Sequence, residues 1–119
     1  MDETTFAHLR PKERTRRYAA RVQQFLEHCP QVGGYEWSMV ATSCKSIDFG
    51  DGLRWKWQTD NAQYRMQTKL RRFAVRNIVR YLTELDMYGN SELEAARDQL
   101  VGDGKELIGI YDAIIAACT

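Results

Sequence analysis

The sequence predicts an α+β fold in which helices cover one face of a small antiparallel sheet. Two kinds of apolar periodicity lead to this class. Apolar residues recur at helical spacing over residues 11–28 and 61–87, whereas they alternate with polar residues over 35–39 and 53–58. The chain has 119 residues, of which 44% are hydrophobic and 28% are charged, as is typical of one globular domain. We therefore expect residues 1–119 to form a single domain.

The first element is predicted to be a helix over residues 11–28, after a flexible lead-in at 1–10. Pro11 suits the first turn of a helix, because its missing N–H has no intrahelical partner there. Pro30 disfavours helical geometry at the residue before it, so the helix is expected to end near residue 28. Its apolar stripe consists of Tyr18, Val22, Phe25, Leu26 and Cys29.

A β-hairpin or a three-stranded meander is predicted over residues 35–58. A three-residue loop, 50–52, would place Phe49 opposite Leu53 and keep the apolar residues on one face. The alternating aromatic residues are Tyr35, Trp37, Trp55 and Trp57. They could form a stacking platform for single-stranded nucleic acid, but the basic residues alternate with them and so lie on the opposite face. We expect the aromatic face to be core.

A long amphipathic helix is predicted over residues 61–87, capped by Asp60 or Asn61 and ending before Gly89. Its apolar stripe is Met66, Leu70, Phe73, Ala74, Ile78, Tyr81 and Leu85. Two shorter helices are expected to follow, because Ser91 with Glu94 and Asp103 with Glu106 each match a capping box. We expect both to pack on the same face of the sheet.

The charge of the chain is divided unevenly along its length. Residues 1–80 hold 15 basic and 8 acidic residues, whereas residues 81–119 hold 2 basic and 8 acidic residues. Five cationic residues of the long helix fall within an arc of about 80° at helical spacing. This basic row is Arg65, Lys69, Arg72, Arg76 and Arg80. Further candidates for the same binding surface are Arg54 and Lys56 on the hairpin, and Arg14, Arg17 and Arg21 on the first helix.

The basic row has two interpretations. It could track the phosphates of a nucleic acid, because guanidinium groups match phosphate oxygens and bind them without regard to sequence. Alternatively, it could pair with acidic residues of the C-terminal helices and be neutralised within the chain. The acids available for this pairing are Glu92, Glu94, Asp98, Glu106 and Asp112.

No catalytic, metal or cofactor motif is recognisable. The histidines and cysteines show no CxxC, HxxH or HExxH spacing, the flanks of Cys44 match no nucleophile motif, and the glycines match no phosphate-binding loop. We therefore expect no catalytic residues, no metal and no small-molecule cofactor. No apolar run approaches the roughly 18 residues that span a bilayer, so no membrane association is expected. Three cysteines without framework spacing favour a cytoplasmic protein.

These observations favour a non-catalytic protein that binds nucleic acid through the basic helix face, led by phosphates and weakly specific for sequence. The alternative is a small inhibitor or adaptor, of the kind found among phage and mobile-element accessory factors, that binds an acidic protein surface. The division of charge also permits a homodimer in which basic surface meets acidic surface.

Overall fold

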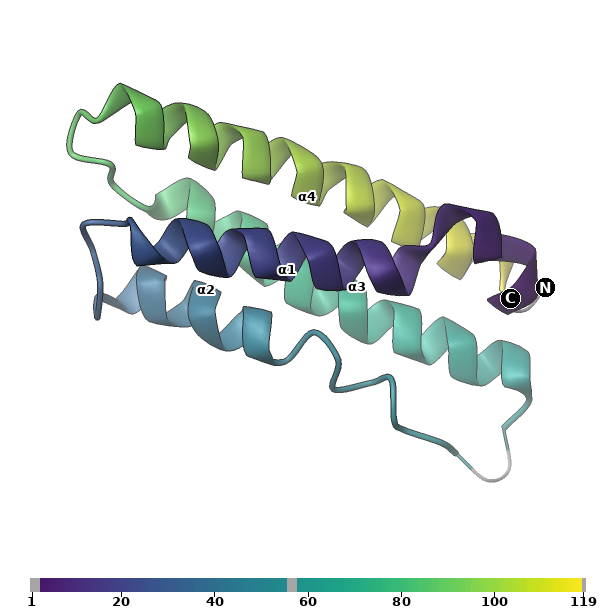
Figure 1. Ribbon diagram of the computed structural model, residues 1–119. Coiled ribbons are helices and arrows are strands. Elements are labelled where there is room, and N and C mark those ends of the chain that lie inside the picture. The colour runs from purple at the N-terminus through teal and green to yellow at the C-terminus, as the bar shows by residue number, and fades with distance from the viewer. Residues whose placement is uncertain (1–2, 56–57, 119) are drawn as a thin grey trace.

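A computed structural model of the chain describes residues 3–55 and 58–118. These residues form a short 3₁₀ helix and four α-helices (Figure 1). The bounds are η1 Glu3–Leu9, α1 Pro11–Glu27, α2 Tyr35–Lys45, α3 Asp60–Glu84 and α4 Ser91–Ala117. The α-helices lie along one long axis, with both ends of the chain at the same end of the molecule (Figure 1). The extents are 50 × 23 × 18 Å.

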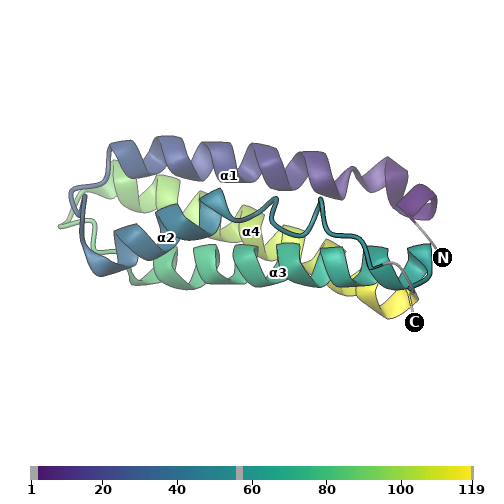
Figure 2. The same ribbon diagram turned by 90° about the horizontal axis from the view of Figure 1, so that it is seen from below.

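The four α-helices form an up-down-up-down bundle. Helix α1 packs against α2 and α4, and α3 packs against the same two helices. Helices α1 and α3 are therefore diagonal neighbours, as the two ribbon views show (Figures 1 and 2). Sequential antiparallel neighbours joined by short connections are the usual topology of such bundles.

The predicted α+β class is wrong, because the described residues contain no strand and residues 35–45 form helix α2. The alternation of Tyr35, Trp37 and Met39 covers too few residues to distinguish a strand from a helix. Continued along the chain, the buried positions Val40 and Cys44 follow Trp37 at the spacing of a helix. The Trp37 indole N–H donates to the carbonyl of Leu26 at 2.9 Å and holds α2 against α1.

Residues 46–55 form turns and an extended segment instead of a hairpin. Backbone N–H groups of Phe49, Asp51 and Leu53 each donate to the carbonyl three residues earlier, which makes a run of consecutive turns. Two side-chain amides of α3 form the hydrogen bonds to this segment that a neighbouring strand would otherwise form. The Gln67 amide donates to the Leu53 carbonyl at 3.1 Å, and the Gln63 amide oxygen accepts from the Trp55 N–H at 3.1 Å. Two residues of the predicted second strand, 56 and 57, lie outside the described residues.

The helices predicted at 11–28 and 61–87 are present as α1 and α3, but α3 ends at Glu84, three residues before the predicted end. The capping residue of α3 is Thr59, whose hydroxyl accepts from the Ala62 N–H at 3.1 Å, and not Asp60 or Asn61.

The two predicted C-terminal helices are one helix, α4, which passes through Gly104 without a break. A Cβ at this glycine would collide with the Tyr18 hydroxyl of α1 and a Val79 methyl of α3. Gly104 therefore allows three helices to approach closely, and it does not end a helix.

Helix α2 is much shorter than its neighbours. The bundle therefore has one half with all four helices and another half, near the termini, that α2 does not reach. The 11 residues of α2 rise about 16 Å, whereas the 25 residues of α3 rise about 37 Å. The main apolar core includes Val22, Leu26, Val40 and Ile78 and lies where all four helices are present. In the other half, residues 46–55 lie beside α3 and η1 covers the end, with Phe6 packed near Tyr64 at a ring-centroid distance of 6.3 Å.

Candidate functional site

The basic row lies on the outward side of α3, where helical spacing places it. The buried residues of α3 are Tyr64, Gln67, Thr68, Arg71, Ala74, Val75, Ile78, Tyr81 and Leu82. At 100° per residue, Lys69, Arg76 and Arg80 lie about 180° away from this buried face. Arg80 is 67% exposed and Arg76 is 55% exposed, whereas Arg72 is 23% exposed because it turns toward α4.

Several members of the row are paired within the chain. The Arg72 Nη1 lies 2.7 Å from an Asp112 carboxylate oxygen of α4, and the Arg76 Nη2 lies 3.9 Å from the same oxygen. The Arg65 Nε donates to the carbonyl of Ile115 at 3.2 Å. Pairing with acids of the C-terminal segment, the alternative interpretation, thus holds for Arg72 and Arg76, which lie near Asp112.

Arg80 completes the row one turn from the C-terminal end of α3. Its Nε lies 3.9 Å from the Glu84 carboxylate, and its guanidinium lies 5.1 Å from the centre of the Tyr81 ring. Both contacts are on the surface of the helix, where such pairs contribute at most about 1 kcal/mol. Arg80 therefore stays accessible to a partner.

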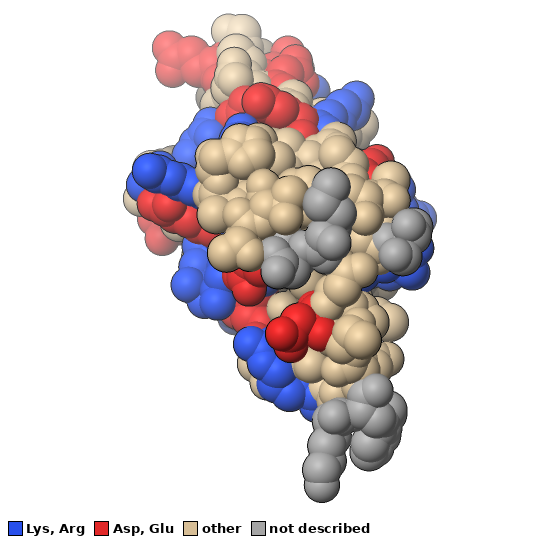
Figure 3. Space-filling model, turned by 90° about the vertical axis from the view of Figure 1, so that its right-hand side faces the viewer, with Lys and Arg blue, Asp and Glu red and all other residues tan. Residues whose placement is uncertain are grey.

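The basic residues of α1 are paired as well. Arg14 contacts Glu106 at 3.3 Å and Arg21 contacts Asp103 at 2.8 Å, so both bridge α1 to α4. Arg17 contacts Glu13 within α1 at 2.5 Å. This group does not extend the basic row, because α1 is diagonal to α3. At the end of the molecule where the termini lie, basic and acidic side chains alternate along one edge (Figure 3).

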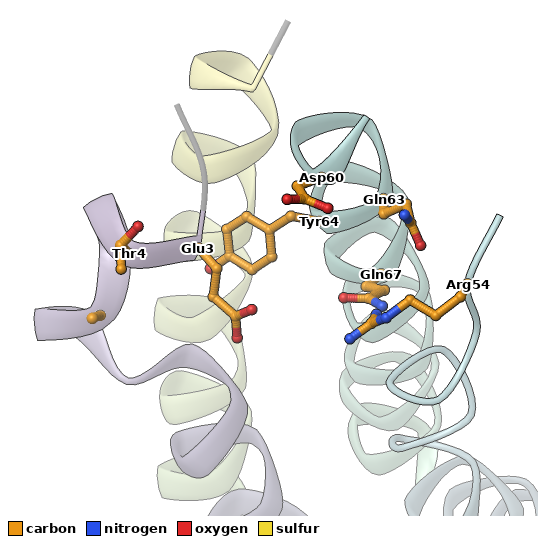
Figure 4. Close-up of a pocket in the computed structure, with 8 residues that line it drawn as sticks. Glu3, Thr4, Arg54, Asp60, Gln63, Tyr64 and Gln67 are labelled. Carbon is orange, nitrogen blue, oxygen red and sulfur yellow. The ribbon is translucent and has the colours of Figure 1, made fainter. Parts of the chain in front are cut away.

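The hairpin candidates also stay apart from the row. Arg54 is exposed and donates to the carbonyl of Leu53 at 3.3 Å. Its side chain reaches over Gln67, on the side of α3 that faces the bundle interior (Figure 4). Lys56 lies outside the described residues.

The apolar stripe predicted for α3 is wrong in the first half of the helix. Phe73 is 66% exposed and Met66 is 38% exposed, whereas Gln67, Thr68 and Arg71 are buried in their place. Phe73 lies within about 60° of Lys69 and Arg76 around the helix. We call Met66, Lys69, Phe73, Arg76 and Arg80 the α3 face; it combines apolar and cationic side chains.

Phe49 extends this apolar character beside α3. A Cβ on the neighbouring Gly50 would lie 2.7 Å from a Leu70 methyl, so the connection passes directly over Leu70. Phe49 is 68% exposed. The exposed Phe49 is thus one residue away from the point where the connection crosses Leu70, which follows Met66 by one turn.

A buried ion pair, Asp51 with Arg71, was missed by the sequence reasoning, which treated Asp51 as a turn residue. Arg71 Nε and Nη2 donate to one Asp51 carboxylate oxygen at 3.0 and 2.6 Å. The side chains are 3% and 8% exposed. The sequence did contain a signal, because Arg71 is four residues before Val75 and seven before Ile78, in phase with the true core.

Burial is the main cause of the raised pKa values of Cys44, Tyr18, Tyr64 and Tyr111. Burial raises the pKa of the Cys44 thiol to about 12 and the pKa of Tyr111 to about 12. A thiol in this state is a poor nucleophile at neutral pH. No group of three or more His, Cys, Asp or Glu side chains in 3–55 and 58–118 is arranged to hold a metal ion.

Within the described part of the chain, no helix combines the length and the apolar character needed to cross a membrane. Protein-family models, curated proteins and solved structures contain no match to this chain.

Proposed function

We propose that this protein is a non-catalytic binding module that docks an acidic protein surface on the α3 face. The observation that carries the proposal is the exposure of Phe73, at 66%, between cationic side chains on a rigid helix. Aromatic and arginine side chains are the residue types that most often dominate the energy of protein interfaces. A protruding ring with a cationic rim suits an apolar pocket with acidic edges.

Charge on the α3 face supports an acidic partner. Two of its cations lie near a carboxylate: Arg76 is 3.9 Å from Asp112, and Arg80 is 3.9 Å from Glu84. Contacts this long and exposed leave most of the positive potential available to a partner. Such potential mainly raises the rate of encounter and selects partners by sign.

Nucleic-acid binding is the second candidate, and it depends on a different observation. The five cations of the row extend over about 22 Å of helix, a length that spans several phosphates. The α1 cluster adds nothing to this footprint, because it is paired with Glu106, Asp103 and Glu13 on another side of the bundle. Phosphate binding would also leave the exposure of Phe73 without a role.

The experiment that tests the leading proposal is site-specific photocross-linking in cells of the source organism. A photoreactive phenylalanine analogue replaces Phe73, and in a separate variant it replaces Val32, which is 66% exposed in the α1–α2 connection. We expect a defined protein adduct from position 73 and none from position 32. The same adduct from both positions, or nucleic acid as the only adduct, would exclude the α3 face as a protein-docking surface.

The identified partner is then titrated against purified variants. Truncation of an interface anchor costs about 2 kcal/mol or more, so Phe73→Ala should weaken binding about 30-fold. Val32→Ala is the matched control and should bind as the parent does. Since Phe73 is exposed, its truncation should change the free energy of unfolding by less than about 0.5 kcal/mol. Equal binding by both variants would contradict the proposal.

Nucleic acid and self-association are measured on the same samples. Labelled DNA and RNA are titrated across salt, and light scattering gives the mass of the protein. Micromolar binding that falls steeply with salt, and that Arg72→Glu with Arg76→Glu abolishes, would establish the second candidate. A dimer that Phe73→Ala dissociates would mean that the occupant of the α3 face is another copy of this chain.

We also propose that the protein functions in the cytoplasm. All three of its cysteines lie among the described residues, where they are buried and form no disulfide. Buried thiols of this kind persist in a reducing compartment. Fractionation of source cells with an antibody to the protein tests the location.

A further inference from the structure

The short length of α2 leaves an opening between α1 and α3 in the half of the bundle near the termini. There the segment 46–55 runs between the two helices (Figure 2). Two adjoining cavities occupy this region, with volumes of about 420 and 440 Å³, and both are lined by Glu3, Ala7 and Tyr64. Cavities of this size commonly hold small organic ligands.

The first cavity lies between η1 and the N-terminal half of α3. Tyr64 reaches from α3 toward η1, the Glu3 carboxylate lies below its ring, and Arg54 with Gln67 forms the facing wall (Figure 4). The second cavity continues from Tyr64 toward α1 and Arg71. Tyr64 is thus the side chain at which the two cavities meet.

Three buried polar groups at this place have no hydrogen-bond partner among the described residues: the Tyr64 hydroxyl, the Arg71 Nη1 and the Asp51 Oδ2. The Asp51 Oδ2 lies 3.5 Å from Arg16 Nη2, so the Tyr64 hydroxyl and the Arg71 Nη1 are the donors that lack an acceptor. Each of these two donor side chains is 3% exposed, and each lines the second cavity. Asp51 occupies the Arg71 Nε and Nη2, so the third nitrogen of the guanidinium remains. Buried donors are almost always paired in native proteins, and a bound acceptor would complete both groups.

The walls of the second cavity carry more positive than negative charge. Five basic and two acidic residues line it. Two of these basic residues, Arg16 and Arg71, pair with Asp48 and Asp51, so the formal excess that remains is one positive charge. The basic residues are Arg10, Lys12, Arg16, Arg17 and Arg71. The first turn of α1, with Pro11 at its first position, also lines the cavity, and the first turn of a helix presents N–H groups without intrahelical acceptors.

We propose that this cavity binds a small organic oxyanion, a carboxylate or a phosphate monoester with a compact body. Its oxygens accept from the Arg71 Nη1 and the Tyr64 hydroxyl, and Lys12, which also lines the cavity, balances its charge. The body packs on Ala7, Pro11 and the Tyr64 ring. The site is separate from the α3 face, because Tyr64 and Arg71 point into the bundle.

Titration calorimetry on the full chain in about 0.15 M salt, which screens exposed charge, tests the proposal. The probes are inorganic phosphate, phenyl phosphate and benzoate. We expect saturable binding of phenyl phosphate or benzoate with a dissociation constant on the order of 1 mM or tighter. The stronger of the two identifies the headgroup, and inorganic phosphate binds more weakly because it has no body to pack. No saturation by any probe up to about 20 times that concentration would overturn the proposal.

Tyr64→Phe is the decisive variant, because it removes the unpartnered hydroxyl and keeps the ring against Phe6. A hydrogen bond to a charged ligand predicts affinity about tenfold lower or more. Arg21→Gln is the matched control for charge, since Arg21 pairs with Asp103 away from this cavity. Lys12→Gln removes a cation that lines the cavity and is compared with this control. Two outcomes would mean that the anion does not occupy the cavity: an equal loss of affinity in Lys12→Gln and Arg21→Gln, or unchanged affinity in Tyr64→Phe. Thermal unfolding of each variant without ligand verifies that it is folded.

Discussion

Replacing Arg71 by Met leaves the Asp51 carboxylate buried without its main partner. That carboxylate is 8% exposed and accepts two hydrogen bonds from Arg71, at 3.0 and 2.6 Å. Removing one partner of a buried ion pair typically costs about 3–5 kcal/mol, because the remaining charge stays desolvated. Arg16 Nη2 lies 3.5 Å from the other Asp51 oxygen and compensates in part. We therefore expect a loss near the lower limit, about 3 kcal/mol in the free energy of unfolding.

Urea denaturation followed by circular dichroism measures this loss, and two variants make it interpretable. Arg72→Met is the matched control, because the adjacent Arg72 pairs with Asp112 at a site where the side chains are 23% and 49% exposed. Its loss should be at most about 1 kcal/mol. Asp51→Asn combined with Arg71→Met removes the lone charge, and it should recover at least about 1 kcal/mol relative to Arg71→Met. Equal losses in Arg71→Met and Arg72→Met would refute the reasoning that burial makes the first pair important.

Three further predictions concern stability, and denaturant midpoints verify each. Gly104→Ala should lower the free energy of unfolding by about 1–3 kcal/mol, because the added Cβ would collide with Tyr18. Gly102→Ala is the control: an added Cβ there meets no atom within 4 Å, so it should raise the free energy of unfolding by up to about 1 kcal/mol. The opposite order would contradict the packing role of Gly104. Asn90→Ala should cost about 1 kcal/mol, because the Asn90 side chain accepts from the Leu93 N–H at 3.0 Å as the N-cap of α4, and no loss would exclude that cap. Burial raises the pKa of Cys44 from 9.0 to about 12, so the folded state retains its proton and stability should fall as pH rises from 9 toward 12; Cys44→Ala should show a shallower decline, and an unchanged slope would mean that Cys44 does not contribute.

The parts of the fold that the sequence predicts well are the long periodic segments. Helices α1 and α3 each repeat their apolar pattern over several turns, which separates the helical period from the period of a strand. Helix α2 has 11 residues, and its first turns contain three bulky apolar residues at alternate positions. A short alternating run is compatible with both structures, and the tertiary contacts of Trp37 and Val40 decide between them. Local propensity has less influence than packing in such a segment.

The roles of one glycine and two glutamines could not be predicted for a related reason. The match of Asp103 and Glu106 to a capping box predicted a helix start there, but the missing side chain of Gly104 lets α1, α3 and α4 approach one another within one continuous helix α4. Gln63 and Gln67 have no obvious role in the sequence, yet their amides bind the backbone of residues 53–55 and make a second strand unnecessary. Each role depends on a neighbour that is distant in sequence, so it cannot be predicted from a local sequence pattern.

The sequence predicted the cations of the α3 face, Lys69, Arg76 and Arg80, but it placed the apolar members Met66 and Phe73 in the core. The basic row is on the outside of α3, as its spacing predicted, but the apolar stripe changes phase along the helix. From Ala74 onward the core residues are apolar, whereas before it the buried residues include Gln67, Thr68 and Arg71. The short α2 explains two of these polar residues. Beyond its end, α3 faces residues 46–55, where the Leu53 carbonyl accepts from Gln67 and the Asp51 carboxylate accepts from Arg71, and apolar side chains could not donate to either group. The apolar residues of that half, Met66 and Phe73, therefore turn outward among the cations. One structural cause, the length of α2, thus accounts for both the α3 face and the polar cavity on the opposite side of the same helix.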